Sequence, residues 1–150
     1  MTPPEAAAVV RERFGVEPAL EGALLTVSLP ADRWVEFARF ARGELGCLYF
    51  NWLSATDWKE RGLEVLCRVE NLDAGLAVMM KSPLPPGQTH CPTLTGVYRG
   101  ADWMERECYD LLGVVFDDHP DLRRILLAQD WEGHPLRKDY AHDMPHAPYR

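Results

Sequence analysis

Closely spaced cysteines, basic runs and long apolar segments are all missing from this sequence. Its four cysteines, Cys47, Cys67, Cys91 and Cys108, lie far apart, and none belongs to a Cys-x-x-Cys pair. Iron–sulfur clusters and structural zinc sites of the usual kinds need close ligand pairs, so we expect neither in this chain. We interpret the thiols as buried side chains of a protein in a reducing compartment.

Positive charge is also scarce. Sixteen Lys and Arg residues stand against 23 Asp and Glu residues, which gives a formal net charge of −7. The basic residues form no long run, so we expect no direct binding to nucleic acid or to anionic membranes. Residues 45–56 carry no charge but are too few to cross a bilayer, and the first residues lack the features of a signal peptide.

What is present fits one folded domain of α+β class. The length is 150 residues, with 47% hydrophobic and 26% charged residues. Residues 1–82 read as α-β-α-β-β-β, with helices over one face of a sheet. A capping box, Thr2 with Glu5, opens the first helix and Gly15 ends it; a second helix follows from about Pro30. Strands are predicted near 25–29, 47–53, 63–69 and 76–80 from their apolar alternation, the last three as a meander.

The second half is divided by its prolines. We predict a stiff Pro-rich connector over 83–92, a helical segment over 93–113 and an extended arm over 114–150. The helix should begin at a second capping box, Asp102 with Glu105, and end at Gly113. The arm contains several prolines and, at most, one helical turn over 121–127, but its composition over 114–140 is not that of a disordered segment. Such a chain satisfies its backbone best against another protein, so we expect a docking arm that is mobile in an isolated copy.

Charged residues on the helix and on the arm allow two interpretations. The helix carries Glu105, Arg106, Glu107 and Asp110, and the arm carries Arg123, Arg124 and Arg137. They are either a solvated helix face, with Arg106 and Asp110 paired one turn apart, or a charge lattice that fixes the arm to its own domain or to a partner. We favour the lattice and expect Arg123→Ala to impair assembly of a complex rather than its chemistry.

Catalytic and metal-binding arrangements are not apparent. His90 adjoins Cys91, but adjacent residues rarely activate each other and no orienting carboxylate is fixed nearby. The histidines at positions 119, 134, 142 and 146 have irregular spacing, so we predict that they cap or bond the backbone instead of binding a metal. We therefore name no catalytic, cofactor-binding or metal-binding residue.

Four segments in order carry a family resemblance. They are Pro-Thr-Leu-Thr-Gly-Val-Tyr at 92–98, Asp-Trp-Met-Glu-Arg-Glu-Cys-Tyr-Asp-Leu-Leu-Gly at 102–113, His-Pro-Asp-Leu-Arg-Arg-Ile-Leu at 119–126 and Gly-His-Pro-Leu-Arg-Lys-Asp-Tyr at 133–140. This sequence resembles the C subunit of proton-pumping NADH-quinone oxidoreductase, the thirty-kilodalton subunit of respiratory complex I. The resemblance covers about residues 47–140, while residues 1–46 match only in pattern.

The resemblance implies a non-catalytic member of the hydrophilic arm of that translocase. Its extended segment would pack on the D subunit, near the B subunit, at the cytoplasmic face of the inner membrane, with membrane contact only through partners. NADH, FMN, iron–sulfur clusters and quinone would be held elsewhere in the complex. The residues predicted to bind partners or support the structure are Glu105, Arg106, Glu107, Asp110, His119, Asp121, Arg123, Arg124, His134, Arg137, Lys138 and Asp139.

Two departures and two alternatives stay open. Asp118 stands where the family usually has Gly, and Ala141 where it usually has Pro. If position 118 needs a positive φ, Asp tolerates it better than most residues. The equivalent subunit of a membrane-bound hydrogenase, or of a complex fed by another electron donor, would have nearly the same sequence pattern. A stand-alone enzyme for a small molecule is a remote alternative, which a deep pocket around perturbed carboxylates would favour.

Overall fold

The first helix begins and ends where its sequence predicts. A computed structural model describes residues 1–141. Helix α1 (Pro3–Phe14) opens with reciprocal bonds: the Glu5 N–H donates to Thr2 Oγ1 (3.3 Å), and the Thr2 N–H donates to the Glu5 carboxylate (2.7 Å). Gly15 ends it at φ 65°. The capping box and the glycine stop are therefore confirmed.

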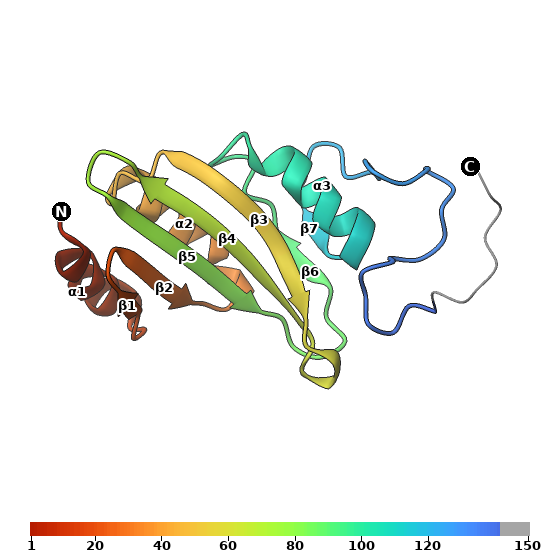
Figure 1. The fold of residues 1–150 in the computed structure, drawn as a ribbon, viewed down its shortest axis with the longest axis horizontal. Coiled ribbons are helices and arrows are strands. Elements are labelled where there is room, and N and C mark those ends of the chain that lie inside the picture. Colours follow the sequence, from red (N-terminus) through yellow and green to blue (C-terminus); the bar gives the residue numbers. More distant parts are fainter. Residues whose placement is uncertain (142–150) are drawn as a thin grey trace.

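A five-stranded mixed sheet forms the centre of the fold (Figure 1). Its strands are β1 (Ala19–Glu21), β2 (Leu24–Ser28), β3 (Tyr49–Asp57), β4 (Leu63–Asn71) and β5 (Leu76–Pro83), in the order β1-β2-β5-β4-β3. Strands β2 and β5 run parallel, and the other pairs are antiparallel. The meander of β3, β4 and β5 is confirmed. Strand β1 was not predicted, because its three residues are all exposed and have no apolar alternation.

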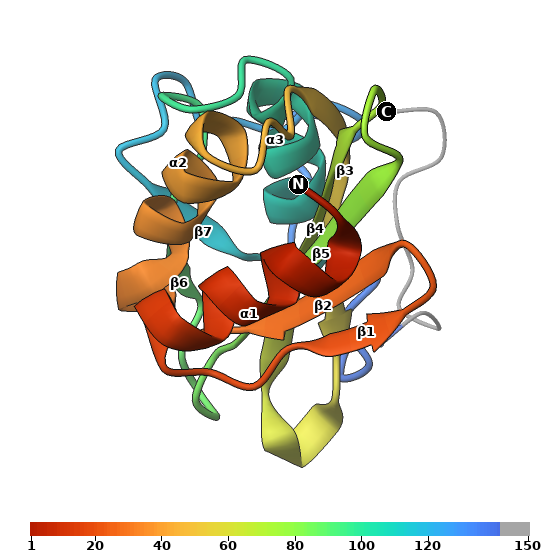
Figure 2. The same cartoon turned by 90° about the vertical axis from the view of Figure 1, so that its left-hand side faces the viewer.

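Three helices lie on one side of this sheet. Figure 2 shows α1, α2 (Trp34–Gly43, after the 3₁₀ turn Ala31–Arg33) and α3 (Ala101–Leu112) on the same face. The phenylalanines of α1 and α2 meet edge to face, with Phe14 5.0 Å from Phe37 and 5.1 Å from Phe40 between ring centroids. Beneath them, β4 buries every second residue from Leu63 to Val69. The α+β class and the one-sided helix layer are as predicted.

A second, two-stranded sheet joins segments that we predicted as connector and arm. Strand β6 (His90–Pro92) pairs in parallel with β7 (Val115–Asp117). Val114 and Phe116 are buried, so the first residues after Gly113 pack into the domain instead of leaving it. Strand β5 also runs further than expected, to Pro83. Its neighbour β2 pairs only as far as Lys81, so no ladder bond on that side is lost at the proline.

Two local predictions near α3 are wrong. The helix begins at Ala101 after Gly100, which offers no side-chain cap, so Asp102 and Glu105 form no capping box. Glu105 is instead buried on the inner face of the helix. Residues 121–127 contain no helical turn, and 118–141 run as irregular, extended chain (Figure 1). His142 and His146 lie outside the described residues.

The four cysteines are all free and buried, as predicted. Burial raises the pKa of the Cys47 thiol to about 12 and raises the pKa of the other three thiols further. These groups are therefore thiols at neutral pH and pack as small apolar side chains. Within residues 1–141, every helix is too short or too polar to traverse a bilayer.

Candidate functional site

One carboxylate at the end of α3 holds the arm. Asp110 is fully buried, and its Oδ1 lies 2.7 Å from Arg124 Nη1. Its Oδ2 accepts three successive backbone N–H groups, from Ile125 (3.2 Å), Leu126 (2.8 Å) and Leu127 (2.9 Å). We call this set the Asp110 anchor: Asp110, Arg124 and the three N–H groups. The carboxylate satisfies the N–H groups that a helical turn would otherwise bond, which explains why residues 121–127 do not form the predicted turn.

The anchor keeps Asp110 ionised. Burial on its own would raise the pKa of this carboxyl, but the Arg124 guanidinium and the three N–H donors outweigh it and hold the pKa below its usual value. Arg124 is itself only 9% exposed, so each charge depends on the other for compensation. Breaking such a buried pair by removing one partner typically costs about 3–5 kcal/mol.

Arg124 also joins two distant parts of the arm. Its Nη1 donates to the Asp110 carbonyl (3.0 Å), and its Nη2 donates to the Gly133 carbonyl (2.8 Å). The Gln129 amide closes the intervening loop by donating to the Arg124 carbonyl (2.8 Å). The planar guanidinium fork suits this task, because its donors point in fixed directions. One side chain thereby fixes residues 124–133 against the end of α3.

His134 and Gly113 complete the end of the helix. His134 Nδ1 lies 3.0 Å from the Asp110 carbonyl and donates to it, and the Leu136 N–H donates to the Leu111 carbonyl (2.8 Å). Gly113 has φ 78°, and a Cβ there would lie 2.7 Å from His134 Cδ2. Only glycine meets both the backbone angle and the close approach. The second His-Pro block is therefore packed on the C-terminal end of α3.

The first His-Pro block is bound near the start of the same helix. His119 Nδ1 accepts the Asp121 N–H (3.0 Å), which leaves Nε2 to donate to the Asp102 carbonyl (3.1 Å). The predicted backbone bonding by His119 and His134 is confirmed. Asp118 has φ 65°, so the position where the family usually has Gly does require the left-handed region.

Glu105 ties a loop to the inner face of α3. It is fully buried, and it accepts the Thr93 hydroxyl (2.5 Å) and the Leu94 N–H (2.9 Å). Burial raises the pKa of Glu105 to about 7, while these two donors act in the opposite direction. The residue thus serves a segment of its own domain and not the arm. Charged residues are seldom buried without such partners, so periodicity alone did not reveal this contact.

Most of the predicted charge lattice is not formed inside the described chain. Arg106 donates to the carbonyls of Arg123 (3.2 Å) and Arg124 (3.0 Å) rather than to Asp110, so the predicted i,i+4 pair is wrong. Of the expected cross-links between acids and arginines, the structure brings together Asp110 with Arg124. The other two arm arginines of the predicted lattice pair with acids of the arm itself, Arg123 with Asp121 (2.9 Å) and Arg137 with Asp139 (3.3 Å). Glu107 forms no such cross-link within residues 1–141 and lines a surface hollow together with Leu136.

The arm has one further attachment that the sequence did not suggest. The Lys138 N–H donates to Asp57 Oδ2 (2.9 Å), at the far end of β3. This N–H is the foremost of the groups that lower the pKa of Asp57. No local pattern links positions so far apart, so this contact could not be found from spacing. Thr93 and Gly133 were missed for the same reason.

Apolar side chains remain outside on this fixed arm. Leu126 and Leu136 are 61% and 57% exposed, although their backbone N–H groups are held by Asp110 and by Leu111. No group of three or more His, Cys, Asp or Glu side chains suited to a metal ion occurs in residues 1–141. Fold and site together define an α+β protein whose extended C-terminal arm is anchored to α3.

The comparisons with known proteins identify the family. A model of the family described as "Respiratory-chain NADH dehydrogenase, 30 Kd subunit" matches residues 27–146. The chain belongs to this family. The C subunit of NADH-quinone oxidoreductase from Chlorobium phaeobacteroides is 39% identical over 140 residues, covering 88% of this chain and 84% of the relative. A combined C/D subunit from Aeromonas salmonicida is 45% identical over 97 residues, which cover 59% of this chain and 16% of that longer protein.

Solved structures share the fold. Nqo5, as a trypsin-resistant fragment (1-134), matches with a TM-score of 0.68 and 23% identity, over 81% of this chain and all of the fragment. A chain of the membrane-bound sulfane sulfur reductase, an archaeal respiratory membrane complex, matches with a TM-score of 0.78 and 23% identity, over 93% of this chain and 85% of the other. At this identity the likeness concerns the fold alone.

Proposed function

We propose that this chain is the C subunit of a proton-translocating NADH-quinone oxidoreductase and has a docking role in it. In this proposal it holds neighbouring subunits in place while they pass electrons from NADH to quinone, and its own residues take no part in the chemistry. NADH, FMN, iron–sulfur clusters and quinone are bound by other subunits of the assembled enzyme. Family membership, and the names of relatives that align over most of the chain, support this assignment.

The anchored arm is the observation that carries the proposal. Its backbone is bound at the Asp110 anchor, yet Leu126 and Leu136 extend apolar surface into solvent. Burying a leucine side chain stabilises a protein by roughly 1.5–3 kcal/mol, and the isolated chain does not obtain this stabilisation from Leu126 and Leu136. Covering them with a partner would recover that free energy without the entropy cost of first ordering the arm.

The D subunit is the partner that we propose for this arm. A relative in which the C and D sequences form one protein indicates that the two work side by side, since fusion keeps them at high local concentration. We further propose that the B subunit lies near the same contact, and that the chain reaches the cytoplasmic face of the inner membrane through these partners. The partner-facing residues would then be the exposed members of the predicted set, Glu107, Arg123, Lys138 and Asp139 among them.

The equivalent subunit of a complex with another electron donor is the second candidate. The likeness to a chain of the sulfane sulfur reductase complex favours it, because this fold also occurs in a complex whose name includes no NADH dehydrogenase. A membrane-bound hydrogenase would be of the same kind. The stand-alone enzyme gains no support, since the shifted carboxylates Glu105 and Asp110 are occupied by internal hydrogen bonds.

Affinity purification from native membranes tests the assignment. The full chain, tagged and expressed in place of the native copy, should co-purify with NADH-binding and quinone-site subunits; hydrogenase or sulfur-reductase subunits instead would support the second candidate. Leu126→Glu combined with Leu136→Glu should reduce co-purification at least about tenfold, because two charges would enter an apolar contact. Leu72→Glu, at a similarly exposed leucine in the β4–β5 turn, is the matched control. Recovery of the chain alone would overturn the proposal.

A further inference from the structure

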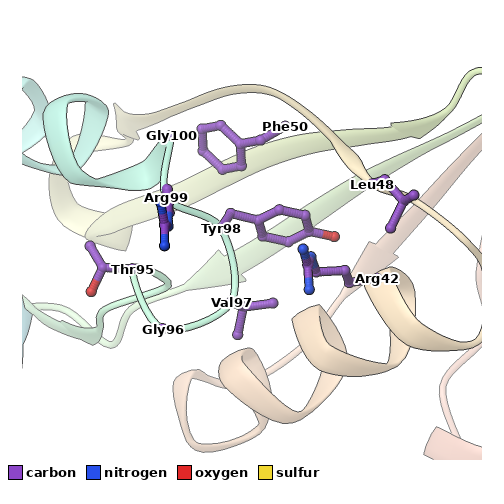
Figure 3. A pocket seen from close by; sticks show the side chains of 9 residues that line it. All are labelled: Arg42, Leu48, Phe50, Thr95, Gly96, Val97, Tyr98, Arg99 and Gly100. Atoms are coloured by element: carbon purple, nitrogen blue, oxygen red, sulfur yellow. The ribbon is translucent and has the colours of Figure 1, made fainter.

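A groove runs between α2 and the loop before α3, away from the arm. Two adjoining hollows of about 440 and 410 Å³ share the residues Arg42, Leu48, Gly96 and Val97. Figure 3 shows Arg42 on α2 close to the Tyr98 ring, and Arg99 on the loop; both line the larger hollow. The arm lines neither hollow. The groove is therefore a surface separate from the docking arm.

Three arginines without ion pairs in the described chain line this groove. Arg39, Arg42 and Arg99 are exposed, and within residues 1–141 none of their guanidinium groups forms an ion pair or hydrogen bond. Glu36 of α2 and Glu44, which follows α2, line a third hollow with Arg39, but they pair with Arg33 and Arg13. In a chain of net charge −7, three arginines without acidic partners mark a place where negative charge from outside is attracted.

The floor of the groove is rigid. The Tyr98 hydroxyl donates to the Cys47 carbonyl (2.8 Å), and its ring packs on Phe50 with 5.5 Å between centroids. Gly100 lies so close that a Cβ there would be 3.0 Å from Phe50 Cδ1. A pre-formed floor lowers the entropy cost of binding, so a bound segment would not have to order the site first.

The groove combines apolar side chains with arginines, and this combination indicates what kind of ligand it can bind. The two hollows share one wall, in which Leu48 is 69% exposed and Val97 also takes part. A free anion such as phosphate would use the arginines but not the apolar wall. A peptide uses both, because a carboxylate pairs with guanidinium while a neighbouring side chain covers the leucine.

We propose that this groove binds an acidic segment of a neighbouring protein, with a carboxylate at Arg42 and Arg99 and an apolar side chain on Leu48 and Val97. It gives the chain a second docking surface, on a different side from the arm. The inference rests on the groove alone and does not require the parent complex to be an NADH-quinone oxidoreductase. Arg39, further along α2, would extend the contact to a second acid.

Site-specific photo-crosslinking in intact cells tests this proposal. Leu48 is replaced by photoreactive benzoylphenylalanine in the full chain, and the crosslinked peptide is sequenced by mass spectrometry. We expect one segment of another protein that carries Asp or Glu within a few residues of the crosslink. In the Arg42→Glu, Arg99→Glu variant the yield should fall at least about tenfold, because attraction becomes repulsion. Arg61→Glu, an exposed arginine outside the groove, should leave the yield unchanged.

The remaining outcomes overturn the proposal. Crosslinks to lipid alone, to a segment without acidic residues, or to nothing would each do so, as would a yield that the double charge reversal leaves intact. If that variant fails to fold, Arg42→Gln with Arg99→Gln takes its place and should lower the yield severalfold. The proposed function is tested by a different experiment, the co-purification of subunits with the tagged chain and with its arm variants. Its failure would therefore be distinguished from failure of the groove proposal.

Discussion

The sheet with its helices and the arm are held together by different means. In the domain, apolar side chains from α1, α2 and alternate positions of β4 are removed from water. In the arm, residues 118–141 bury little apolar surface and are attached through Asp110, His119 and Asp57. The domain is thus stabilised by buried apolar surface area, to which many residues contribute, whereas the arm depends on a few polar contacts. A single substitution should therefore affect the arm far more selectively than the domain.

Removing the central carboxylate should have the largest effect. Asp110→Ala leaves the Arg124 charge buried without compensation and frees three N–H groups, so we expect a local loss of about 3–5 kcal/mol. Hydrogen exchange in the isolated chain should show the amides of residues 125–127 and of Leu136 deprotected while β4 and β5 are unchanged. Asp121→Ala, which removes an exposed pair with Arg123, is the matched control and should change protection little. Equal effects of the two substitutions would show that the anchor does not hold the arm.

The free energy of unfolding should depend on pH through Glu105, the buried carboxyl group that binds Thr93 and Leu94. Since the pKa of Glu105 is raised to about 7 by burial, the folded chain binds a proton there more tightly than the unfolded chain. Its contribution is fully present below the unfolded pKa of about 4.3 and is lost as the pH rises through 7, by roughly 3.5 kcal/mol in all. Urea unfolding across this range should show that slope, and Glu105→Gln should remove it. The same slope in both proteins would refute the assignment.

Substitutions at the two glycines that end α1 and α3 should show how much stability is lost through backbone strain and how much through a clash with the arm. Gly15 and Gly113 both have positive φ, but a Cβ meets nothing within 4 Å at Gly15 and meets His134 at 2.7 Å at Gly113. Gly15→Ala should cost about 1–2 kcal/mol from the backbone alone. Gly113→Ala should cost about 1–3 kcal/mol more, because the His134 ring must move. Equal losses in thermal unfolding would mean that His134 is not packed there.

The smallest effect in the isolated chain should belong to Arg123. Its pair with Asp121 is exposed, so Arg123→Ala should lower the free energy of unfolding by less than about 1 kcal/mol. In the native complex, the same substitution should reduce co-purification without changing the turnover of the complex that does form. Normal assembly with reduced quinone reduction would contradict a docking role for this residue.

The sequence predicted the domain better than the arm for a physical reason. Alternation in β4 and the Thr2–Glu5 box are local signals, and both were interpreted correctly. The favoured lattice of helix acids and arm arginines included Asp110 and Arg124, but an irregular chain has no period from which to tell which arginine meets which acid. Glu105 was assigned to a cap because burial of its charge depends on Thr93, which only the folded chain brings near. Asp118 was interpreted correctly through its tolerance of positive φ.

Hydrogen exchange of the arm, measured in the isolated chain and in the assembled complex, tests the docking account most directly. In the isolated chain we expect the amides of residues 125–127 and of Leu136 to be protected, since Asp110 and Leu111 bind them, while the amides of Glu132 and Gly133 exchange quickly. In the complex, protection should extend over the whole of 118–141. An identical pattern in both states would contradict the claim that this arm is built to lie against a partner.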